Sequence, residues 1–192
     1  MLDEDEICVV TGLPRSGTSL MMQMLDCVGF DLVYDDVKKP DEHNPKGYYE
    51  YSKMFELSDD NDIDWFRECT GKVININGEL ATYIPIFNDI NYKVVYMMRD
   101  YVEITHSQMK KMGVEDYDVD EHVRLLIGLD TKLRAFFEDV DNIDIVYISY
   151  NNLIDDPKTG IAPLKFLFDI DEYMESKMLD KIDEDLYRNR NE

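Results

Sequence analysis

The sequence has few of the features that mark secreted, membrane-spanning or metal-binding proteins. It contains three cysteines among its 192 residues, Cys8, Cys27 and Cys69. Their odd number and wide spacing exclude a disulfide framework and show no metal-ligand pattern. Residues 1–6 are mostly acidic, where a signal peptide would be basic. Because no apolar run approaches the ~20 residues of a membrane span, we expect a cytoplasmic protein.

Basic residues are also scarce, since 20 lysines and arginines stand against 42 acidic residues and the formal net charge is −22. Such a surface repels nucleic acids and anionic membranes, so neither is expected as a partner. An anionic ligand would need a local cluster of cations, which makes each arginine informative. The chain is 44% apolar, which is enough for the core of one domain spanning residues 1–192.

Short apolar runs and helical patterns alternate along the chain. Runs rich in Val and Ile predict buried strands at residues 7–11, 73–76, 92–98 and 143–148. Patterns between and after them predict helices at 18–28, 49–57, 80–87, 102–112 and 122–140, and a helical tail from Asp155 onward. This alternation favours an α/β fold with a central parallel sheet of about four to five strands, flanked by helices and binding ligands at the strands' carboxyl ends.

The strongest local signal is the segment Gly-Leu-Pro-Arg-Ser-Gly-Thr-Ser at residues 12–19, between the first predicted strand and the first predicted helix. Gly12 and Gly17 would let the backbone curl closely around an anion. The amides of residues 16–19 would then point at that anion, aided by the helix dipole. An ordinary glycine-containing turn is the structural alternative, but the strand-to-helix context favours phosphate binding.

The segment departs from the phosphate-binding loop of nucleoside triphosphatases at one position. That loop has a lysine before its final Ser or Thr, whereas this sequence has Thr18 there and carries its cation at Arg15. An arginine side chain is always charged and can bind two oxygens at once. The change argues against ordinary ATP or GTP hydrolysis and fits a 5′-phosphosulfate instead.

In this form the loop resembles that of the sulfotransferases that use 3′-phosphoadenosine-5′-phosphosulfate (PAPS), specifically the bacterial and viral branch whose loop reads PRSGTS. The resemblance implies a P-loop-like three-layer fold, PAPS as co-substrate and no obligatory metal. It also implies that Arg15 neutralises the bridging oxygen as the sulfuryl group departs. Thr18 and Ser19, together with Ser16 and Gly17, would hold the 5′-phosphate.

A second anion site is indicated after the strand predicted at 92–98. Family members bind the 3′-phosphate of PAPS with an Arg at the end of such a strand and a Ser eight residues later, and Arg99 and Ser107 match that spacing. Both could contact one phosphate, because Ser107 lies about two helical turns beyond the strand end. A rival interpretation makes Asp100 the metal-binding acid of a hydrolase, which the neighbouring Arg99 and the absent loop lysine disfavour.

Three more segments resemble the same family. They are Asn-Pro-Lys-Gly-Tyr-Tyr-Glu at 44–50, Tyr-Ile-Ser-Tyr-Asn-Asn-Leu-Ile-Asp-Asp-Pro at 147–157, and Leu-Tyr-Arg-Asn-Arg at 186–190. Each is weak alone, because Asn-Pro and Asp-Pro are common turn signals. Their order and spacing extend the resemblance over nearly the whole chain.

The acceptor of the sulfuryl group needs a base, which members of this family supply as Glu or His. In the branch that uses Glu, the residue lies about twenty positions after the loop arginine. Asp36 is therefore the first choice for the base here, and Glu50 and His43 are the alternatives.

Relatives carry a lysine on the strand predicted at 73–76 that helps to stabilise the transferring group, and this sequence has Asn75 there. Either Lys46 or Lys72 compensates for the missing charge, or activity is low. The resemblance thus implies a sulfotransferase that acts on a hydroxyl or amine of a small-molecule or glycan acceptor and releases 3′,5′-ADP. A non-catalytic PAPS-binding module and a small-molecule kinase with an altered loop are the alternatives.

Overall fold

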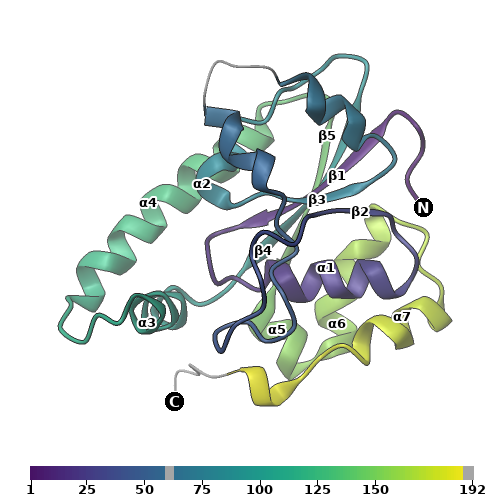
Figure 1. The fold of residues 1–192 in the computed structure, drawn as a ribbon. Helices are drawn as coiled ribbons and strands as arrows, with labels where there is room; N and C mark the ends of the chain where they lie inside the picture. The colour runs from purple at the N-terminus through teal and green to yellow at the C-terminus, as the bar shows by residue number, and fades with distance from the viewer. Residues whose placement is uncertain (59–62, 188–192) are drawn as a thin grey trace.

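The computed structural model describes residues 1–58 and 63–187. Its centre is a sheet of five parallel strands in the order β2-β3-β1-β4-β5 (Figure 1). The strands are β1 (Glu6–Gly12), β2 (Leu32–Val33), β3 (Val73–Asn75), β4 (Asn91–Met98) and β5 (Ile143–Ser149). The expected α/β fold with a parallel sheet of four to five strands is therefore confirmed. The strand missing from the sequence prediction is β2, which is two residues long.

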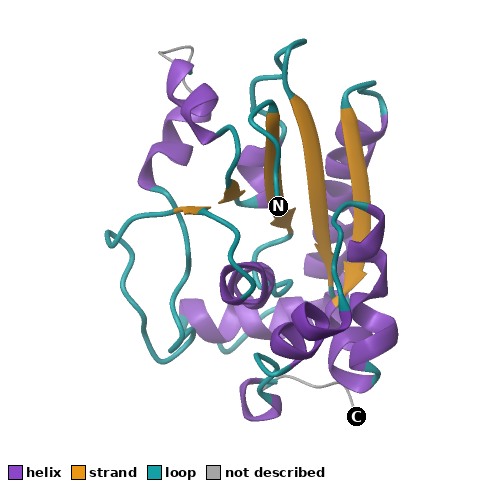
Figure 2. Cartoon of the chain, turned by 90° about the vertical axis from the view of Figure 1, so that its right-hand side faces the viewer, coloured by secondary structure: helices purple, strands orange, loops and turns teal. Residues whose placement is uncertain are grey.

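Helices cover both faces of the sheet, which gives three layers (Figure 2). One face carries α1 (Thr18–Cys27), α5 (Tyr150–Asp155), α6 (Pro157–Ile161) and α7 (Glu172–Leu179). The other carries α2 (Gly78–Ala81), α3 (Tyr101–Met112) and α4 (Val119–Glu138). Short 3₁₀ helices complete the chain: η1 (Ser52–Ser58), η2 (Asp64–Cys69), η3 (Ala162–Phe166) and η4 (Glu184–Leu186).

The central strand β1 shows why the apolar runs are continuous. Cys8 and Val10 point into the core beneath α1, whereas Ile7 and Val9 point into the core beneath α4. All four side chains are fully buried, because a strand covered on both faces buries every side chain and not every second one. All three cysteine thiols are free.

Two predicted helices are wrong or too long. The helix expected at 49–57 is replaced by an extended segment, in which Glu50 forms a bridge with Asn75, followed by the 3₁₀ helix η1. Tyr49 has a φ of +54°, a left-handed conformation that a right-handed helix cannot contain. The helix expected at 80–87 ends with α2 at Ala81, because Pro85 cannot donate a backbone hydrogen bond and restricts the residue before it.

The register of the sheet decides where the candidate site lies. Gly12 at the end of β1 pairs with Met97 near the end of β4. The loop after β1 and the turn after β4 therefore leave the sheet side by side at its carboxyl edge. In the part of the chain that the structure describes, no helix is both long and apolar enough to cross a bilayer.

Gly17 gives a test of the loop that follows β1. Its φ is +103°, and an added Cβ would lie 2.4 Å from Cδ2 of the buried Tyr150 ring. Gly29 is a matched control, with a φ of +94° and no atom within 4 Å of an added Cβ. We expect Gly29→Ala to cost about 1–2 kcal/mol from backbone strain, and Gly17→Ala to cost about 1–3 kcal/mol more from overpacking. Urea unfolding measures both; equal losses would contradict the close approach of Tyr150.

Candidate functional site

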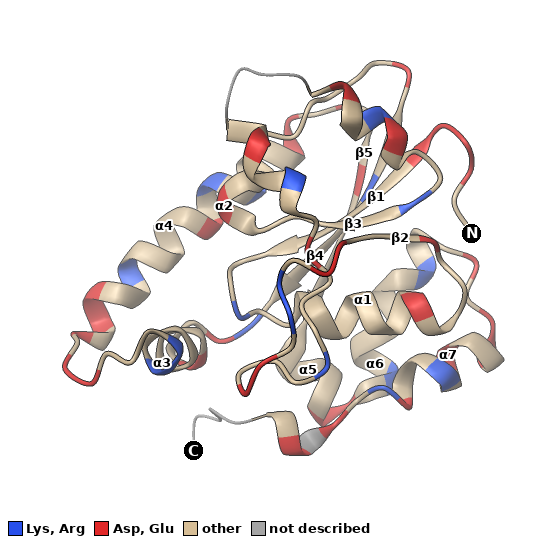
Figure 3. Ribbon diagram, viewed as in Figure 1, with Lys and Arg blue, Asp and Glu red and all other residues tan. Residues whose placement is uncertain are grey.

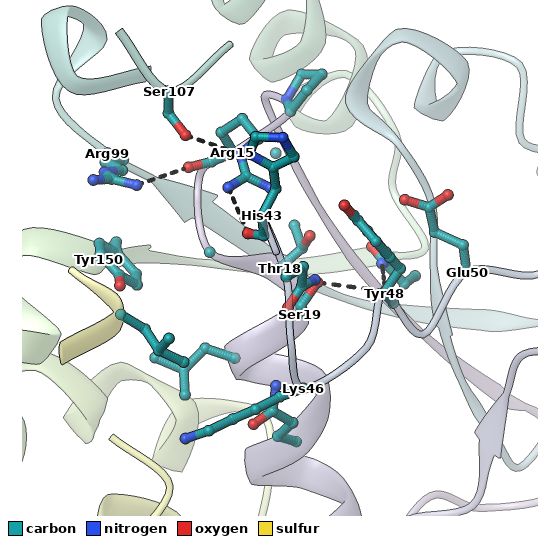
Figure 4. A pocket seen from close by; sticks show the side chains of 18 of the residues that line it. Arg15, Thr18, Ser19, His43, Lys46, Tyr48, Glu50, Arg99, Ser107 and Tyr150 are labelled. Atoms are coloured by element: carbon teal, nitrogen blue, oxygen red, sulfur yellow. Dashed lines mark hydrogen bonds between the residues drawn. The ribbon is translucent and has the colours of Figure 1, made fainter. Parts of the chain in front are cut away.

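A cavity of about 230 Å³ opens at the carboxyl edge of the sheet. Its walls come from the loop after β1, segment 38–50, the ends of β3 and β4, helix α3 and the chain after α7. Figure 4 shows side chains from these distant parts of the sequence converging on Arg15. This is the edge at which parallel α/β sheets bind ligands.

The cavity concentrates positive charge in a protein whose net charge is −22. Within residues 1–58 and 63–187, seven lysines and arginines line it against two acidic residues, whereas acidic residues are spread over the rest of the fold (Figure 3). The cations are Arg15, Lys38, Lys46, Arg99, Lys110, Lys111 and Lys181. The two carboxylates each pair with a lysine of the cavity, Glu50 with Lys38 at 2.6 Å and Asp183 with Lys46 at 2.8 Å. Such a lining suits an anion with several charges.

The loop after β1 presents the start of α1 to the cavity. Gly17 is the N-cap of α1 and supplies no side-chain cap. The first backbone hydrogen bonds of the helix are donated by Leu20 and Met21 to the carbonyl of Gly17. The preceding amides, including those of Thr18 and Ser19, therefore have no partner within the helix. Amides at an open helix N-terminus are ready donors to a phosphate or sulfate.

Arg15 lies at the centre of the cavity with its guanidinium partly buried. Its Nε donates to Ser107 Oγ at 2.9 Å, and its Nη2 donates to the carbonyl of His43 at 3.0 Å. Burial lowers the pKa of Arg15, and the charge of Arg99 lowers it further. The backbone of Arg15 has a φ of +79°, an unusual conformation for a residue with a side chain. Arg99 is paired with Glu103, whereas Arg15 makes no ion pair among the described residues, so the charge of Arg15 is available to an anion in the cavity.

Arg99 follows β4 and is held on three sides. Its Nε donates to Glu103 Oε2 at 2.8 Å, and its Nη1 donates to the carbonyl of Arg15 at 3.3 Å. Its guanidinium carbon lies 4.8 Å from the ring centre of Tyr150 and 5.2 Å from that of Tyr187. Its Nη2 is buried without a hydrogen-bond partner among the described residues. A buried donor left unsatisfied is costly, so this nitrogen points to a missing acceptor.

The predicted donor-binding residues meet in one place, with one exception. Arg15, Gly17, Thr18, Ser19, Arg99 and Ser107 all line the cavity. Ser16 lies beneath the loop, fully buried, and its hydroxyl has no hydrogen-bond partner in the described part of the chain. Asp100, which a hydrolase would use for a metal, accepts hydrogen bonds from the amides of Val102 and Glu103 and so caps α3. The described residues contain no group of three or more His, Cys, Asp or Glu that could hold a metal ion.

The candidate bases are placed differently from one another. Asp36, the first choice from the sequence, is exposed and does not line the cavity. The neighbouring Asp35 carboxylate accepts hydrogen bonds from the amides of Val37 and Ser52, which turns this part of the chain outward. Glu50 and His43 do line the cavity. The structure therefore brings the two alternatives, and not Asp36, to the cavity that contains the loop arginine.

Asn75 stands where the sequence comparison leads one to expect a lysine. Its side chain is buried, and its Nδ2 donates to the carbonyl of Tyr48 at 3.1 Å. Lys72 cannot compensate, because it lies outside the cavity and donates to the carbonyl of Glu68. Lys46 does reach the cavity, as do four lysines that the sequence did not single out: Lys38, Lys110, Lys111 and Lys181. The sequence feature that could have identified them is that basic residues are scarce in this acidic chain. Lys110 and Lys111 are also adjacent at the end of the helix predicted at 102–112.

Segment 41–50, which contains the Asn-Pro-Lys-Gly-Tyr-Tyr-Glu sequence, crosses the loop. The Ser19 hydroxyl donates to the carbonyl of Tyr48 at 3.4 Å and accepts from Asn44 Nδ2 at 2.9 Å. The Tyr48 hydroxyl donates to both oxygens of Asp41, and burial together with this bond raises the pKa of Tyr48 to about 12. The segment thus forms one wall of the cavity. Of the terminal Leu-Tyr-Arg-Asn-Arg sequence, Leu186 lines the cavity, while 188–190 lie outside the described residues.

No family model and no curated protein matches this sequence. Among solved structures, the chain is similar to a sulfotransferase domain from the Synechococcus PCC 7002 olefin synthase, with a TM-score of 0.50 and 13% identity over 100% of this chain and 82% of that one. It also matches a sulfotransferase domain from the curacin biosynthetic pathway, with a TM-score of 0.48 and 12% identity over 93% of this chain and 78% of that one. The first likeness shows a sulfotransferase-like fold.

Pyrophosphate gives a direct test of the cavity's charge. At low-millimolar concentration it should raise the thermal unfolding midpoint, because a ligand that binds only the folded protein stabilises it by mass action. Each kcal/mol gained shifts the midpoint by roughly 2–4 °C in a protein of this size. Sodium chloride at the same ionic strength is the control, since it screens the net charge without offering a polyanion.

The effect should depend on the cavity and not on surface lysines. Arg15→Gln should reduce the shift caused by pyrophosphate. Lys165→Gln, which removes a lysine paired with Glu175 outside the cavity, should leave it unchanged. Equal midpoints in pyrophosphate and chloride would show that the cavity is not an anion site.

Proposed function

We propose that this protein is a PAPS-dependent sulfotransferase, which moves a sulfuryl group from PAPS to a hydroxyl or amine of a small-molecule or glycan acceptor and releases 3′,5′-ADP. The observation that carries the proposal is the convergence of Arg15 and Arg99, from the ends of β1 and β4, in one cationic cavity. The sulfotransferase-like fold supports the same class of reaction.

The donor has two anionic ends, and the cavity offers a set of donors for each. The open N-terminus of α1, with Arg15, Thr18 and Ser19, suits the 5′-phosphosulfate. Arg99, with its unsatisfied Nη2, and the nearby Ser107 suit the 3′-phosphate. PAPS would supply the activated sulfuryl group, while these residues bind and orient it.

Sulfuryl transfer, like phosphoryl transfer, depends mainly on positioning and on stabilising developing charge. Arg15 would neutralise the oxygen that bridges phosphorus and sulfur as negative charge accumulates on it. Its guanidinium has five N–H donors, of which those on Nε and Nη2 contact Ser107 and His43. The remaining N–H groups can donate hydrogen bonds to the oxygens of PAPS without loss of these contacts.

Glu50 is the base that we propose for the acceptor hydroxyl. Its carboxylate lies at the cavity wall opposite the Arg99 side, and both of its oxygens lie within 2.8 Å of Lys38 Nζ (Figure 4). Asp36 is too far outside the cavity wall to take this role. His43 is the second candidate, since its backbone carbonyl already contacts Arg15.

Two other functions remain as alternatives, each with its own observation. A binding module without catalysis is favoured by Asn75, whose amide is committed to Tyr48 and brings no charge to the cavity. A small-molecule kinase is favoured by the open start of α1, which would also bind ATP. Thr18 in place of a lysine weakens the kinase, because that lysine normally reaches the terminal phosphates.

Calorimetry with nucleotides tests the donor assignment. We expect 3′,5′-ADP to bind more tightly than ADP or 5′-AMP, and preference for ATP with magnesium would overturn the proposal in favour of a kinase. Arg99→Gln should weaken the binding of 3′,5′-ADP by about tenfold or more, because a charge-assisted hydrogen bond is worth roughly 1.5–3 kcal/mol. Binding of 5′-AMP should change little.

The Arg99→Gln variant should be combined with a second substitution, because the Glu103 side chain is 3% exposed and would lose its counter-charge. The double variant Arg99→Gln/Glu103→Gln avoids a bare buried carboxylate, and Glu103→Gln alone is its control. If 3′,5′-ADP and 5′-AMP were weakened equally, Arg99 would not recognise the 3′-phosphate.

Sulfate transfer from labelled PAPS to components of a cell extract tests catalysis and chooses between the carboxylates. Glu50→Gln should lower turnover by about 10²–10⁴, the usual contribution of a general base, while Asp36→Asn should leave it near the wild-type rate. The reverse result would return the role to Asp36. Binding of 3′,5′-ADP without any transfer would favour the binding module.

A further inference from the structure

The cavity has a second cationic pole around Tyr48. The ammonium of Lys38 lies 4.0 Å from the ring centre of Tyr48, and that of Lys111 lies 4.8 Å from the same point. Tyr48 and Glu50 stand on one side of Arg15, whereas Arg99 and Tyr150 stand on the other (Figure 4). The pole therefore lies away from Arg99, which suits the 3′-phosphate, and next to Ser19, which suits the 5′-phosphosulfate.

The charge at this pole is incompletely compensated. Lys111 is exposed near the end of α3, lines the cavity and makes no ion pair among the described residues. Burial lowers its pKa, and the charges of Lys38 and Arg15 lower it further, more strongly than Asp41 and Glu50 raise it. Lys38 shares its charge with Glu50. Among the described residues, Lys38 thus has an ion-paired carboxylate and Lys111 has none, because the other nearby carboxylate, Asp41, accepts hydrogen bonds from the Tyr48 hydroxyl.

A neutral acceptor would make this imbalance worse. Filling the cavity with it would remove part of the water around the Lys111 ammonium and would offer this charge no partner in exchange. An anionic group would satisfy both lysines. The remote carboxylates of the protein would not prevent its binding, because at about 0.15 M salt their field is screened beyond ~8 Å, whereas ion pairs inside the cavity are screened less.

We propose that the acceptor carries an anionic group of its own, a phosphate, sulfate or carboxylate, that binds between Lys38 and Lys111 beside Tyr48. The inference rests on the proposed sulfotransferase function and adds the class of acceptor to it. Because Lys38 also contacts Glu50, an anion bound to this lysine would hold the rest of the same molecule next to the Glu50 carboxylate.

The reaction then balances without a further reagent. The acceptor oxygen forms a bond to sulfur, and the bond between sulfur and the bridging oxygen of PAPS breaks. The proton of the acceptor hydroxyl passes to Glu50, and 3′,5′-ADP leaves with the electron pair of the broken bond. Lys38 and Lys111 position the acceptor in this step and take no proton.

The first test is binding to the product complex. Protein saturated with 3′,5′-ADP is titrated with inorganic phosphate by calorimetry, in the wild type, in Lys111→Gln and in the control Lys165→Gln. We expect phosphate to bind, Lys111→Gln to weaken it about tenfold, and Lys165→Gln to change nothing. The affinity for 3′,5′-ADP should change less than twofold in either variant.

Three outcomes would overturn the assignment of this pole to the acceptor. The first is that phosphate does not bind to the nucleotide complex. The second is that Arg15→Gln abolishes phosphate binding while Lys111→Gln leaves it intact, which would place the ion where the sulfuryl group sits. The third is that Lys111→Gln weakens binding of 3′,5′-ADP as much as binding of phosphate, which would assign the lysine to the PAPS site. Failure of the protein to bind 3′,5′-ADP at all is a different result and refutes the proposed function itself.

The second test uses unidentified acceptors as they occur. A small-molecule ultrafiltrate of a cell extract is passed over an anion-exchange resin at neutral pH, and each fraction is then offered to the enzyme with labelled PAPS. We expect transfer only to compounds of the retained fraction, with a raised KM for them in Lys111→Gln. Transfer to the unretained fraction would show that the acceptor needs no charge.

Discussion

The parallel pairing of β1 with β4 is the constraint on which the site depends. It brings the chain after Gly12 and the chain after Met97 to the same edge, so that Arg99 donates a hydrogen bond to the carbonyl of Arg15. Two like charges are thereby held together by backbone geometry and not by mutual attraction. A protein with a net charge of −22 gathers positive charge at this edge, which is costly unless an anion binds there.

Much of the fold could be predicted from the sequence, because buried parallel strands and amphipathic helices leave clear patterns. Helices α1, α3 and α4 and four strands lie within a few residues of their expected positions. Strand β2 was missed because two residues carry no periodicity. The α-helix expected at 49–57 failed because its apolar residues Met54 and Leu57 are buried by the 3₁₀ helix η1, and the left-handed Tyr49 at the start of the expected helix has no signature in the sequence.

The site could be predicted where its residues follow a strand directly. Arg15, Thr18 and Arg99 do so, and their separation along the chain was enough to place them. Lys38 and Lys111 lie on a long loop and at a helix end, and their approach to Tyr48 depends on a path that no pattern describes. The exposure of Asp36 likewise depends on a local turn that the sequence pattern does not describe, in which the carboxylate of Asp35 accepts hydrogen bonds from the amides of Val37 and Ser52.

Segment 41–50 acts as an internal surrogate for the ligand. The carbonyls of His43 and Tyr48 accept hydrogen bonds from Arg15 and Ser19, the same groups that an incoming phosphosulfate would use. Under the proposed function, the Ser19 hydroxyl would exchange the Tyr48 carbonyl for an oxygen of PAPS, whereas Arg15 would keep its contacts and use its remaining N–H groups. The affinity for such a ligand would then be reduced by the bond that Ser19 gives up, so residues of this wall would influence how tightly the ligand binds.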